Sequence, residues 1–191
     1  MNIIFFDTET TGLPKNYKAP ATDVENWPRI VELSWTVCTE DGRIVKQESF
    51  VIRPEGFEIP EAASAIHGIS QEYAMTEGVS IKTALEAFTD DYDGCELVVA
   101  HNLNYDLNVI SCEHVRSFGF EITEKAAVCT MKASTEFCAI PSKRGFKYPS
   151  LQELHTTLFG YKFDNEHSAT ADTEAAQRCY FALRKNGVIA S

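Results

Sequence analysis

Long apolar stretches, secretory signals and paired cysteines are all missing from this sequence. No run approaches the ~20 consecutive apolar residues that a membrane-spanning helix needs. The segment Met1–Asp7 lacks the basic start and the small-residue cleavage site of a secretory signal. The six cysteines are scattered without a Cys-x-x-Cys pair, which favours free thiols in a reducing compartment over disulfides or zinc. We therefore expect a cytoplasmic protein with no part in the membrane.

Basic residues are also scarce. The chain carries 17 lysines and arginines against 28 aspartates and glutamates, a formal net charge of −11. Proteins that hold duplex backbones over a wide surface are usually basic, so this balance argues against a large non-specific nucleic-acid surface. A site built from several carboxylates gains positive charge only when it binds metal ions. An enzyme that contacts a short single strand therefore remains compatible with the charge.

What the sequence does contain is enough apolar material for one core, and we treat residues 1–191 as a single domain. Apolar runs at 2–7 and 30–39 predict strands, and Asp41-Gly42 predicts a hairpin turn into a third strand at 43–53. Later segments predict strands at 96–101 and 126–131, and helices at 61–66, from 80, at 104–118, 150–160 and 168–186. The expected fold is α/β, a mixed five-stranded sheet of an antiparallel three-strand meander plus parallel strands, flanked by helices.

The first candidate site residues are Asp7 and Glu9, at the end of the first predicted strand. Residues i and i+2 of a strand point to the same side, so both carboxylates would project together. Two adjacent carboxylates are unfavourable unless a cation neutralises them, and oxygen ligands suit Mg²⁺ or Mn²⁺. A strand that simply ends in a polar turn explains the same residues.

Two further acids follow predicted elements in the same way. Asp106 falls in the first turn of the helix after the strand at 96–101, where a helix dipole tolerates an anion and where α/β proteins often bind ligands. Asp172 begins the last helix, five residues after His167 on the preceding loop. We expect Asp172 to be held rigidly and His167 to lie on a mobile loop, although a histidine in such a place is often a solvent-exposed bystander.

Taken together, the three segments resemble the DEDD (DnaQ-like) superfamily of 3′-to-5′ exonucleases. Residues 5–13 (FFDTETTGL) look like its first motif, and residues 101–106 (HNLNYD) are similar to the second, with Tyr105 where many members have phenylalanine. Residues 167–172 (HSATAD) resemble the third motif of the DEDDh branch, which uses histidine, and residues 66–69 (IHGI) resemble a connecting motif. The resemblance covers residues 3 to about 180 and implies a ribonuclease H-like fold.

The resemblance implies a two-metal mechanism that releases nucleoside 5′-monophosphates. Two Mg²⁺ or Mn²⁺ ions ~4 Å apart can stabilise the attacking and leaving oxygens of a phosphodiester. Asp7 would bridge the metals, Glu9 and Asp172 would complete the site that holds the water, and Asp106 would support the second metal. His167 would act as the general base, a role that suits an imidazole with an ordinary pKa of ~6.5.

Substrate contacts are predicted in two places. By the same resemblance, Thr10 and Thr11 meet the terminal nucleotide, Leu13 wedges against its base, and His67 and Ile69 line the pocket. Simple core packing is the alternative for Leu13 and Ile69.

Tyr105 would stack on a base or pack beneath the site. Lys143 and Arg144 lie in the one concentrated basic segment, 142–148, whose basic and aromatic residues could follow a single strand or merely form a solvated loop.

Several alternatives share these motifs. The expected partner is the 3′ end of single-stranded DNA or RNA, and the enzyme could act in proofreading beside a DNA polymerase, in DNA trimming or in RNA processing. A homodimer is also possible, because some relatives dimerise. A catalytically silent nucleic-acid-binding relative or an unrelated Mg²⁺ phosphatase remains open, but the first conflicts with five intact catalytic positions: Asp7, Glu9, Asp106, His167 and Asp172.

Overall fold

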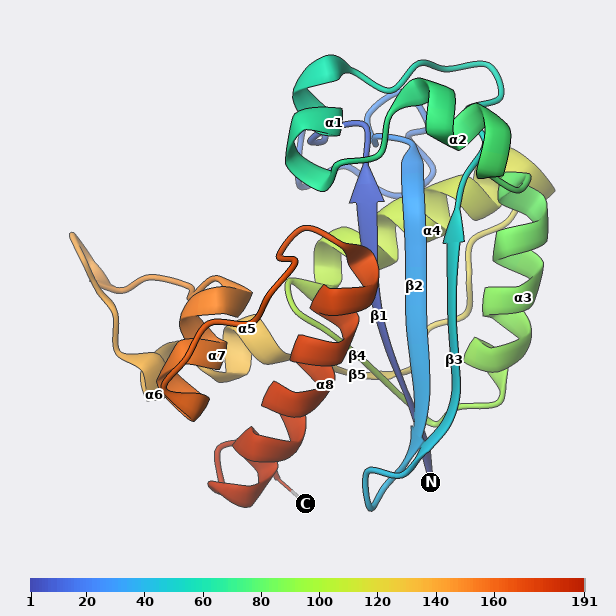
Figure 1. The fold of residues 1–191 in the computed structure, drawn as a ribbon. Helices are drawn as coiled ribbons and strands as arrows, with labels where there is room; N and C mark the ends of the chain where they lie inside the picture. The colour runs from blue at the N-terminus through green and yellow to red at the C-terminus, as the bar shows by residue number, and fades with distance from the viewer. Residues whose placement is uncertain (191) are drawn as a thin grey trace.

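The computed structural model describes residues 1–190 and has a five-stranded sheet at its centre, in the order β3-β2-β1-β4-β5 (Figure 1). The strands β1 (Asn2–Thr10), β2 (Ile30–Thr39) and β3 (Ile44–Val51) form an antiparallel meander. The strands β4 (Leu97–Ala100) and β5 (Ala126–Cys129) continue the sheet parallel to β1. This arrangement confirms the predicted fold class.

Helices cover both faces of the sheet because β1 sends apolar side chains to each. Ile4 and Phe6 belong to one core cluster, which also holds buried residues of α3 (Ile81–Asp93) and α4 (Leu103–Phe118). Ile3 and Phe5 belong to a second cluster with α7 (Leu151–Phe159) and α8 (Ala169–Lys185). The four apolar side chains of residues 3–6 are all fully buried, which explains why this strand has a continuous apolar run instead of an alternating one.

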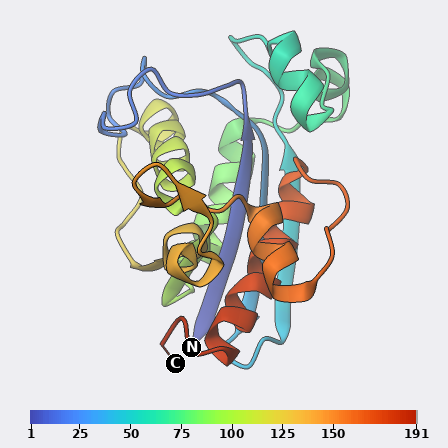
Figure 2. The same cartoon turned by 90° about the vertical axis from the view of Figure 1, so that its left-hand side faces the viewer.

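The short helices α1 (Glu61–His67) and α2 (Gln71–Glu77) lie at the end of the sheet toward which β1 runs (Figures 1 and 2). Ser70 caps α2 by accepting a hydrogen bond from Tyr73 N at 3.1 Å. The sequence analysis did not anticipate α2, although Ser70 is a typical N-cap residue.

Two boundaries differ from the sequence prediction. β1 does not end at Asp7 but continues to Thr10, because Thr8 and Glu9 still pair with Leu33 and Glu32 of β2. The strand predicted to reach Met131 ends at Cys129, and α5 (Thr130–Ala133) and α6 (Thr135–Cys138) follow. The segment 142–148 lies on and beside a small hairpin of β6 (Pro141–Ser142) and β7 (Gly145–Phe146).

Two global expectations concern the membrane and the thiols. Among residues 1–190, no helix combines the length and the apolar character that crossing a membrane requires. All six cysteines are free, and four of them are buried.

Candidate active site

The carboxyl end of β1 supplies the first two acids. Asp7 lies opposite Ser34 of β2, and Glu9 lies opposite Glu32, so both project from the same side of the strand. Asp7 and Glu9 share the strand parity of Ile3 and Phe5, whose side chains pack in the cluster that contains α8. The predicted pair of carboxylates therefore faces the helix that carries Asp172.

Asp106 reaches the site because β4 is parallel to β1 and directly beside it. The chain leaves β4, passes Asn102 in a left-handed conformation (φ 70°), and enters α4 with Asp106 in its first turn. The Asp106 side chain is only 2% exposed. Its Oδ1 accepts a hydrogen bond from Thr8 Oγ1 at 2.8 Å, which ties α4 to β1 beside Asp7.

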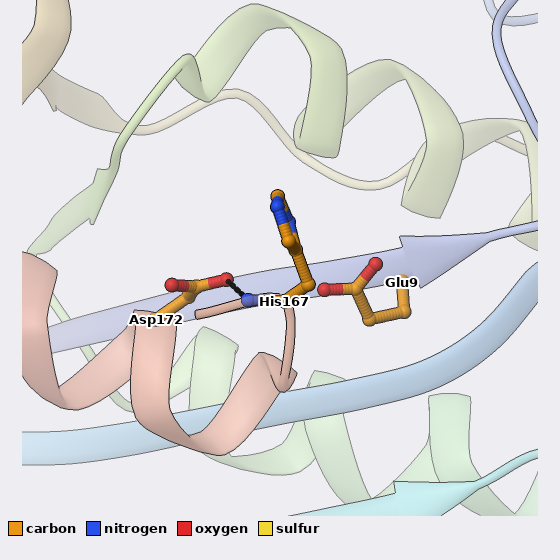
Figure 3. Close-up of side chains that lie close together, drawn as sticks. All are labelled: Glu9, His167 and Asp172. Carbon is orange, nitrogen blue, oxygen red and sulfur yellow. Dashed lines mark hydrogen bonds between the residues drawn. The ribbon is translucent and has the colours of Figure 1, made fainter. Parts of the chain in front are cut away.

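Asp172 and His167 come from the start of α8. His167 is exposed and has a left-handed backbone (φ 71°), and its N–H donates to Asp172 Oδ2 at 3.1 Å. One ligand atom each of Glu9, His167 and Asp172 lie within 4.8 Å of one another. Figure 3 shows His167 between the carboxylates of Asp172 and Glu9. The structure thus brings together residues 158 or more positions apart in the sequence (9 to 167).

Burial and the charges of neighbouring acids raise the pKa values of all four acids. Burial, followed by the charges of Asp106, Asp172 and Glu9, raises the pKa of Asp7 well above its usual range. Burial first, and Asp172 next, raise the pKa of Glu9 to about 8. Burial is also the main cause that raises the pKa of Asp106 to about 7 and that of Asp172 to about 6. Within residues 1–190, no lysine or arginine forms a salt bridge with any of these acids.

This donor set fits a hard divalent cation. Uncompensated carboxylates that converge on one point are unfavourable until a positive charge neutralises them. Asp172 Oδ1 is buried and has no hydrogen-bond partner among the described residues, so it is free to accept an ion. Carboxylate oxygens are the ligands that Mg²⁺ and Mn²⁺ prefer. Asp7, Glu9, Asp106 and Asp172 are the residues that could hold such ions.

A pocket of about 400 Å³ adjoins the acids through Glu9. Five of the predicted substrate residues line it: Thr10, Thr11, Leu13, His67 and Tyr105. Tyr17, Ile66 and Asn102 also line it, although the sequence analysis did not predict them as substrate contacts. Leu13 is 74% exposed, so core packing does not account for it. Tyr105 OH lies 2.6 Å from Thr10 Oγ1 and 2.8 Å from Gly12 O, which holds the loop after β1 in place.

Three predicted substrate residues lie outside this pocket. Ile69 is buried with Val31, Ile59 and Ala74, which agrees with the packing alternative, and we no longer place it against the nucleotide. Its backbone N–H instead donates to His67 Nδ1 at 3.1 Å. Lys143 and Arg144 are exposed at the turn of the β6–β7 hairpin.

His67 gains a defined tautomer from this contact. Because Nδ1 accepts a hydrogen bond, Nε2 carries the proton, and this buried Nε2–H has no partner among residues 1–190. Burial also lowers the pKa of His67, which keeps the ring neutral. His67, one of the residues that line the pocket, therefore carries a single buried donor that has no partner among residues 1–190.

The sequence analysis missed one acid of the site. Glu32 is 9% exposed on β2, and its charge contributes to the raised pKa values of Asp7, Glu9 and Asp172. A signal was present, because Glu32 is the one charged residue in the otherwise apolar and small-polar run of 30–39.

Comparison with known proteins agrees with this geometry. The family model named RNase_T, described as an exonuclease, matches residues 4–180. The chain belongs to this exonuclease family. The family lies within the DnaQ-like (DEDD) superfamily, and its members generally use divalent metal ions.

Curated relatives are longer proteins. DNA polymerase III PolC-type from Latilactobacillus sakei is 24% identical over 182 residues, and that from Listeria monocytogenes is 26% identical over 186 residues. Each match covers 95% of this chain but 11% of the relative, so the chain spans about a tenth of their length.

Solved structures share the fold. A structure of exonuclease I superposes with a TM-score of 0.77 at 16% identity, covering 96% of this chain and 41% of that one. E. coli exonuclease I in complex with a dT13 oligonucleotide gives a TM-score of 0.75 at 17% identity, with coverages of 96% and 41%.

Proposed function

We propose that this exonuclease domain is a metal-dependent 3′-to-5′ exonuclease of the DEDDh branch that shortens single-stranded DNA or RNA and releases nucleoside 5′-monophosphates. One observation carries the proposal. Asp7, Glu9, Asp106 and Asp172 all have raised pKa values at the end of β1, and a ring nitrogen of His167 lies within 4.8 Å of carboxylate oxygens of Glu9 and Asp172. The family to which the chain belongs supports it.

Two divalent ions bound by the four acids would neutralise the charge that develops on the attacking and leaving oxygens of a phosphodiester. Asp7, Glu9, Asp106 and Asp172 would hold these ions, with Glu9 and Asp172 on the side of the attacking water. Thr8 and the N–H of His167 each occupy one oxygen of Asp106 and Asp172, so the remaining oxygens are oriented in advance. The protein itself would contribute to catalysis by orienting these carboxylate oxygens.

His167 would accept the proton of the attacking water. Its backbone N–H is held by Asp172, while its ring remains exposed and within reach of Glu9. General-base catalysis contributes ~10²–10⁴-fold, so His167→Ala should lower kcat within that range and leave metal binding largely intact. Metal binding is measured by calorimetry with Mn²⁺, and near-normal turnover of the variant would contradict the role.

The pocket beside Glu9 suits the 3′-terminal nucleotide. Its apolar wall includes Leu13 and Ile66, against which a base can pack, and His67 Nε2–H offers a donor to a sugar or phosphate oxygen. The hydroxyl network of Thr10 and Tyr105 fixes the backbone at Gly12, which lines the same pocket. These contacts recognise an end, not a sequence.

A single strand would leave the pocket toward the β6–β7 hairpin. In Figure 2 this hairpin, in orange, and the loop that leads into α8 face the viewer on either side of β1. Lys143, Arg144 and Phe146 are exposed on it, which offers cations for phosphates and a ring for stacking. The E. coli exonuclease I complex with dT13 supports a single-stranded ligand.

Two broader assignments complete the proposal. The PolC-type relatives favour a DNA polymerase over a second copy of this chain as the protein partner. The six free thiols accord with the reducing cytoplasm in which we place the protein.

The test uses single-stranded and duplex DNA and RNA oligonucleotides labelled at the 5′ end, with Mg²⁺, Mn²⁺ or a chelator. We expect a ladder that shortens from the 3′ end, the release of mononucleotides, and no reaction with the chelator or with Asp7→Ala. Internal cuts, shortening from the 5′ end, or release of inorganic phosphate alone would each overturn the proposal.

The hairpin has its own test. Lys143→Glu combined with Arg144→Glu should raise KM for a long single strand about tenfold and flatten its salt dependence, with little change in kcat. The control is Lys132→Glu, which sits on α5 and is not part of the hairpin. Equal salt slopes for the wild type and the double variant would remove Lys143 and Arg144 from the binding surface.

A further inference from the structure

Glu32 is a carboxylate of the site that the proposed mechanism does not use. It lies on β2 directly opposite Glu9, is 9% exposed, and takes part in no salt bridge among residues 1–190. A buried carboxylate without a cation is unfavourable unless hydrogen bonds compensate it. The partners of Glu32 therefore show what the residue does.

Both oxygens of Glu32 are engaged by the protein. Oε1 accepts from Ser49 Oγ of β3 at 3.0 Å, and Oε2 accepts from Ala169 N at 3.0 Å. Ala169 is the first residue of α8, and the preceding N-cap, Ser168, makes no side-chain capping bond. Glu32 thus supplies from a neighbouring strand the acceptor that the N-cap side chain lacks, and its charge suits the positive end of the helix.

The start of α8 holds the two residues that face Glu9. Asp172 lies in the first turn, and its Oδ2 accepts the N–H of His167. A second link from the same strand, Thr173 Oγ1 to Ser34 O at 3.3 Å, is buried just behind them. β2 therefore carries both the strand partner of Glu9 and the contacts that locate α8.

We propose that Glu32 is a positioning residue: its hydrogen bond to Ala169 N fixes the first turn of α8, and this sets Asp172 and His167 against Glu9. The catalytic part of this inference rests on the function proposed above, whereas the anchoring of α8 does not. Glu32 is not assigned as a metal ligand, because both of its oxygens already accept hydrogen bonds from the protein.

Two substitutions separate the hydrogen bond from the charge. Glu32→Ala removes both, whereas Glu32→Gln removes the charge and keeps an oxygen that can accept from Ala169 N. Glu48→Ala on β3 is the matched control, since Glu48 lies opposite Trp35 and its charge partner is Lys46, away from α8. Each variant is first checked by thermal unfolding.

The first readout is amide hydrogen exchange of the metal-free protein over residues 163–172. Loss of a helix cap should make exchange there ~10-fold faster in Glu32→Ala, while Glu32→Gln and Glu48→Ala should match the wild type. Unchanged exchange in Glu32→Ala would overturn the anchoring role. This readout stands even if the wild type shortens no nucleic acid, so the two proposals fail separately.

The second readout is steady-state kinetics on a single-stranded oligonucleotide. Loss of a residue that orients metal-holding groups typically lowers activity ~10–100-fold, and we expect this fall in kcat for Glu32→Ala with KM unchanged. Glu32→Gln should recover kcat to within ~3-fold of the wild type. A Glu32→Gln variant as slow as Glu32→Ala would show that the charge matters instead, and would overturn positioning by the hydrogen bond.

A second route guards against a variant that does not fold. Ala169→Pro removes the donor N–H at the first helical position, where proline is tolerated, and Ser168 already has the extended backbone (φ −112°, ψ 123°) that a following proline requires. It should reproduce the faster exchange and the lower kcat. Combining it with Glu32→Ala should add no further loss, because both changes break one hydrogen bond. Additive losses would contradict the proposal.

Discussion

Buried acids occur in two regions of this molecule, and the protein treats them in opposite ways. Glu113 of α4 is 1% exposed, yet its Oε1 lies 2.7 Å from Arg29 Nε and 3.1 Å from Arg116 Nη1. At the end of β1, Asp7, Glu9, Asp106 and Asp172 are also wholly or partly buried, yet within residues 1–190 none of them forms a salt bridge with a lysine or arginine.

This difference in charge compensation distinguishes an acid that stabilises the fold, Glu113, from acids that are suited to bind a positively charged ligand. Two arginines compensate the charge of Glu113, and Arg116 also donates to the carbonyls of Pro28 and Trp27, so it holds the loop of residues 15–28 against α4. The β1 cluster (Asp7, Glu9, Asp106 and Asp172) has no such arginine among residues 1–190, and the repulsion between its carboxylates makes the folded protein less stable. Function here is marked by the charge that the protein leaves uncompensated.

The largest expected effect comes from Asp7→Asn, which replaces one oxygen of the carboxylate and removes its charge. Activity should fall ~10⁴-fold, because the residue would be shared by both metals. The metal-free protein should at the same time become more stable, since a repelling charge is gone. Exonuclease assays and denaturant unfolding in a chelator measure the two effects. A variant both inactive and less stable would place Asp7 with Glu113, as a structural acid.

The opposite result is expected from Arg116→Ala. Removing one cation from a buried cluster leaves Glu113 with Arg29 alone and frees the loop carbonyls, which should lower the free energy of unfolding by ~3 kcal/mol. The kcat of the folded fraction should stay within ~3-fold of the wild type, because no group of the β1 cluster is touched. Urea unfolding tests the first statement. A gain in stability would mean that the arginines do not compensate Glu113, so that the Glu113 cluster and the β1 cluster would both be destabilised by their charges.

The fold was predictable because its signals are local. The continuous apolar run of β1 and the Asp41-Gly42 turn indicate the sheet from the sequence alone. The boundary at Thr10 was not predictable, because pairing with β2 extends the strand through the polar residues Thr8 and Glu9. The helices α2, α5 and α6 were missed because each spans seven residues or fewer and has little apolar periodicity.

The acids of the site were found through motifs, but their surroundings were not. Spacing indicated Asp106 and Asp172, whereas the contacts of Thr8 and Glu32 depend on residues 98 and 137 positions away. The role of Ile69 could not be decided from the sequence, since an apolar residue beside His67 suits a pocket and a core equally. Only its packing against Val31 of β2 and Ala74 of α2 assigns it to the core.

The two regions should also differ in their response to pH. Glu9 has a pKa of about 8 in the folded protein against 4.5 as its ordinary value, so the folded state retains a proton that the unfolded state has lost. The stabilisation from this retained proton is fully present when the pH is below 4.5, the ordinary pKa of a glutamate, and it is lost as the pH rises through about 8. Without metal, unfolding free energy should drop by about 1–2 kcal/mol between about pH 7 and about pH 8.5.

This range avoids an opposing effect. Burial lowers the pKa of His101 to about 4 from 6.5, and such a histidine makes stability rise with pH, but only below its ordinary value. Thermal unfolding at several pH values checks the prediction. Saturating Mn²⁺ should abolish the drop, and Glu9→Gln should flatten it. A drop of the same size in Glu9→Gln would assign the pH dependence to another group.

The smallest expected effect concerns Thr8, whose hydroxyl donates a hydrogen bond to Asp106 Oδ1 at 2.8 Å. This hydrogen bond lowers the pKa of Asp106 and so partly offsets the burial that raises it to about 7. Thr8→Val keeps the shape of the side chain and removes the donor, so the pKa of Asp106 should rise further. The free energy of unfolding at about pH 8 should therefore fall by ~1 kcal/mol.

The same variant should also need more metal, because a metal ion must then displace a proton that Asp106 holds more tightly. The Mn²⁺ concentration for half-maximal activity at about pH 7 should rise roughly fivefold and return toward the wild-type value at about pH 8.5. A shift that persists at the higher pH would mean that Thr8 orients Asp106 more than it favours its charge. In that case a neutral hydroxyl would resemble the arginines beside Glu113 in holding a carboxylate in place, and the contrast between the two regions would rest on cations alone.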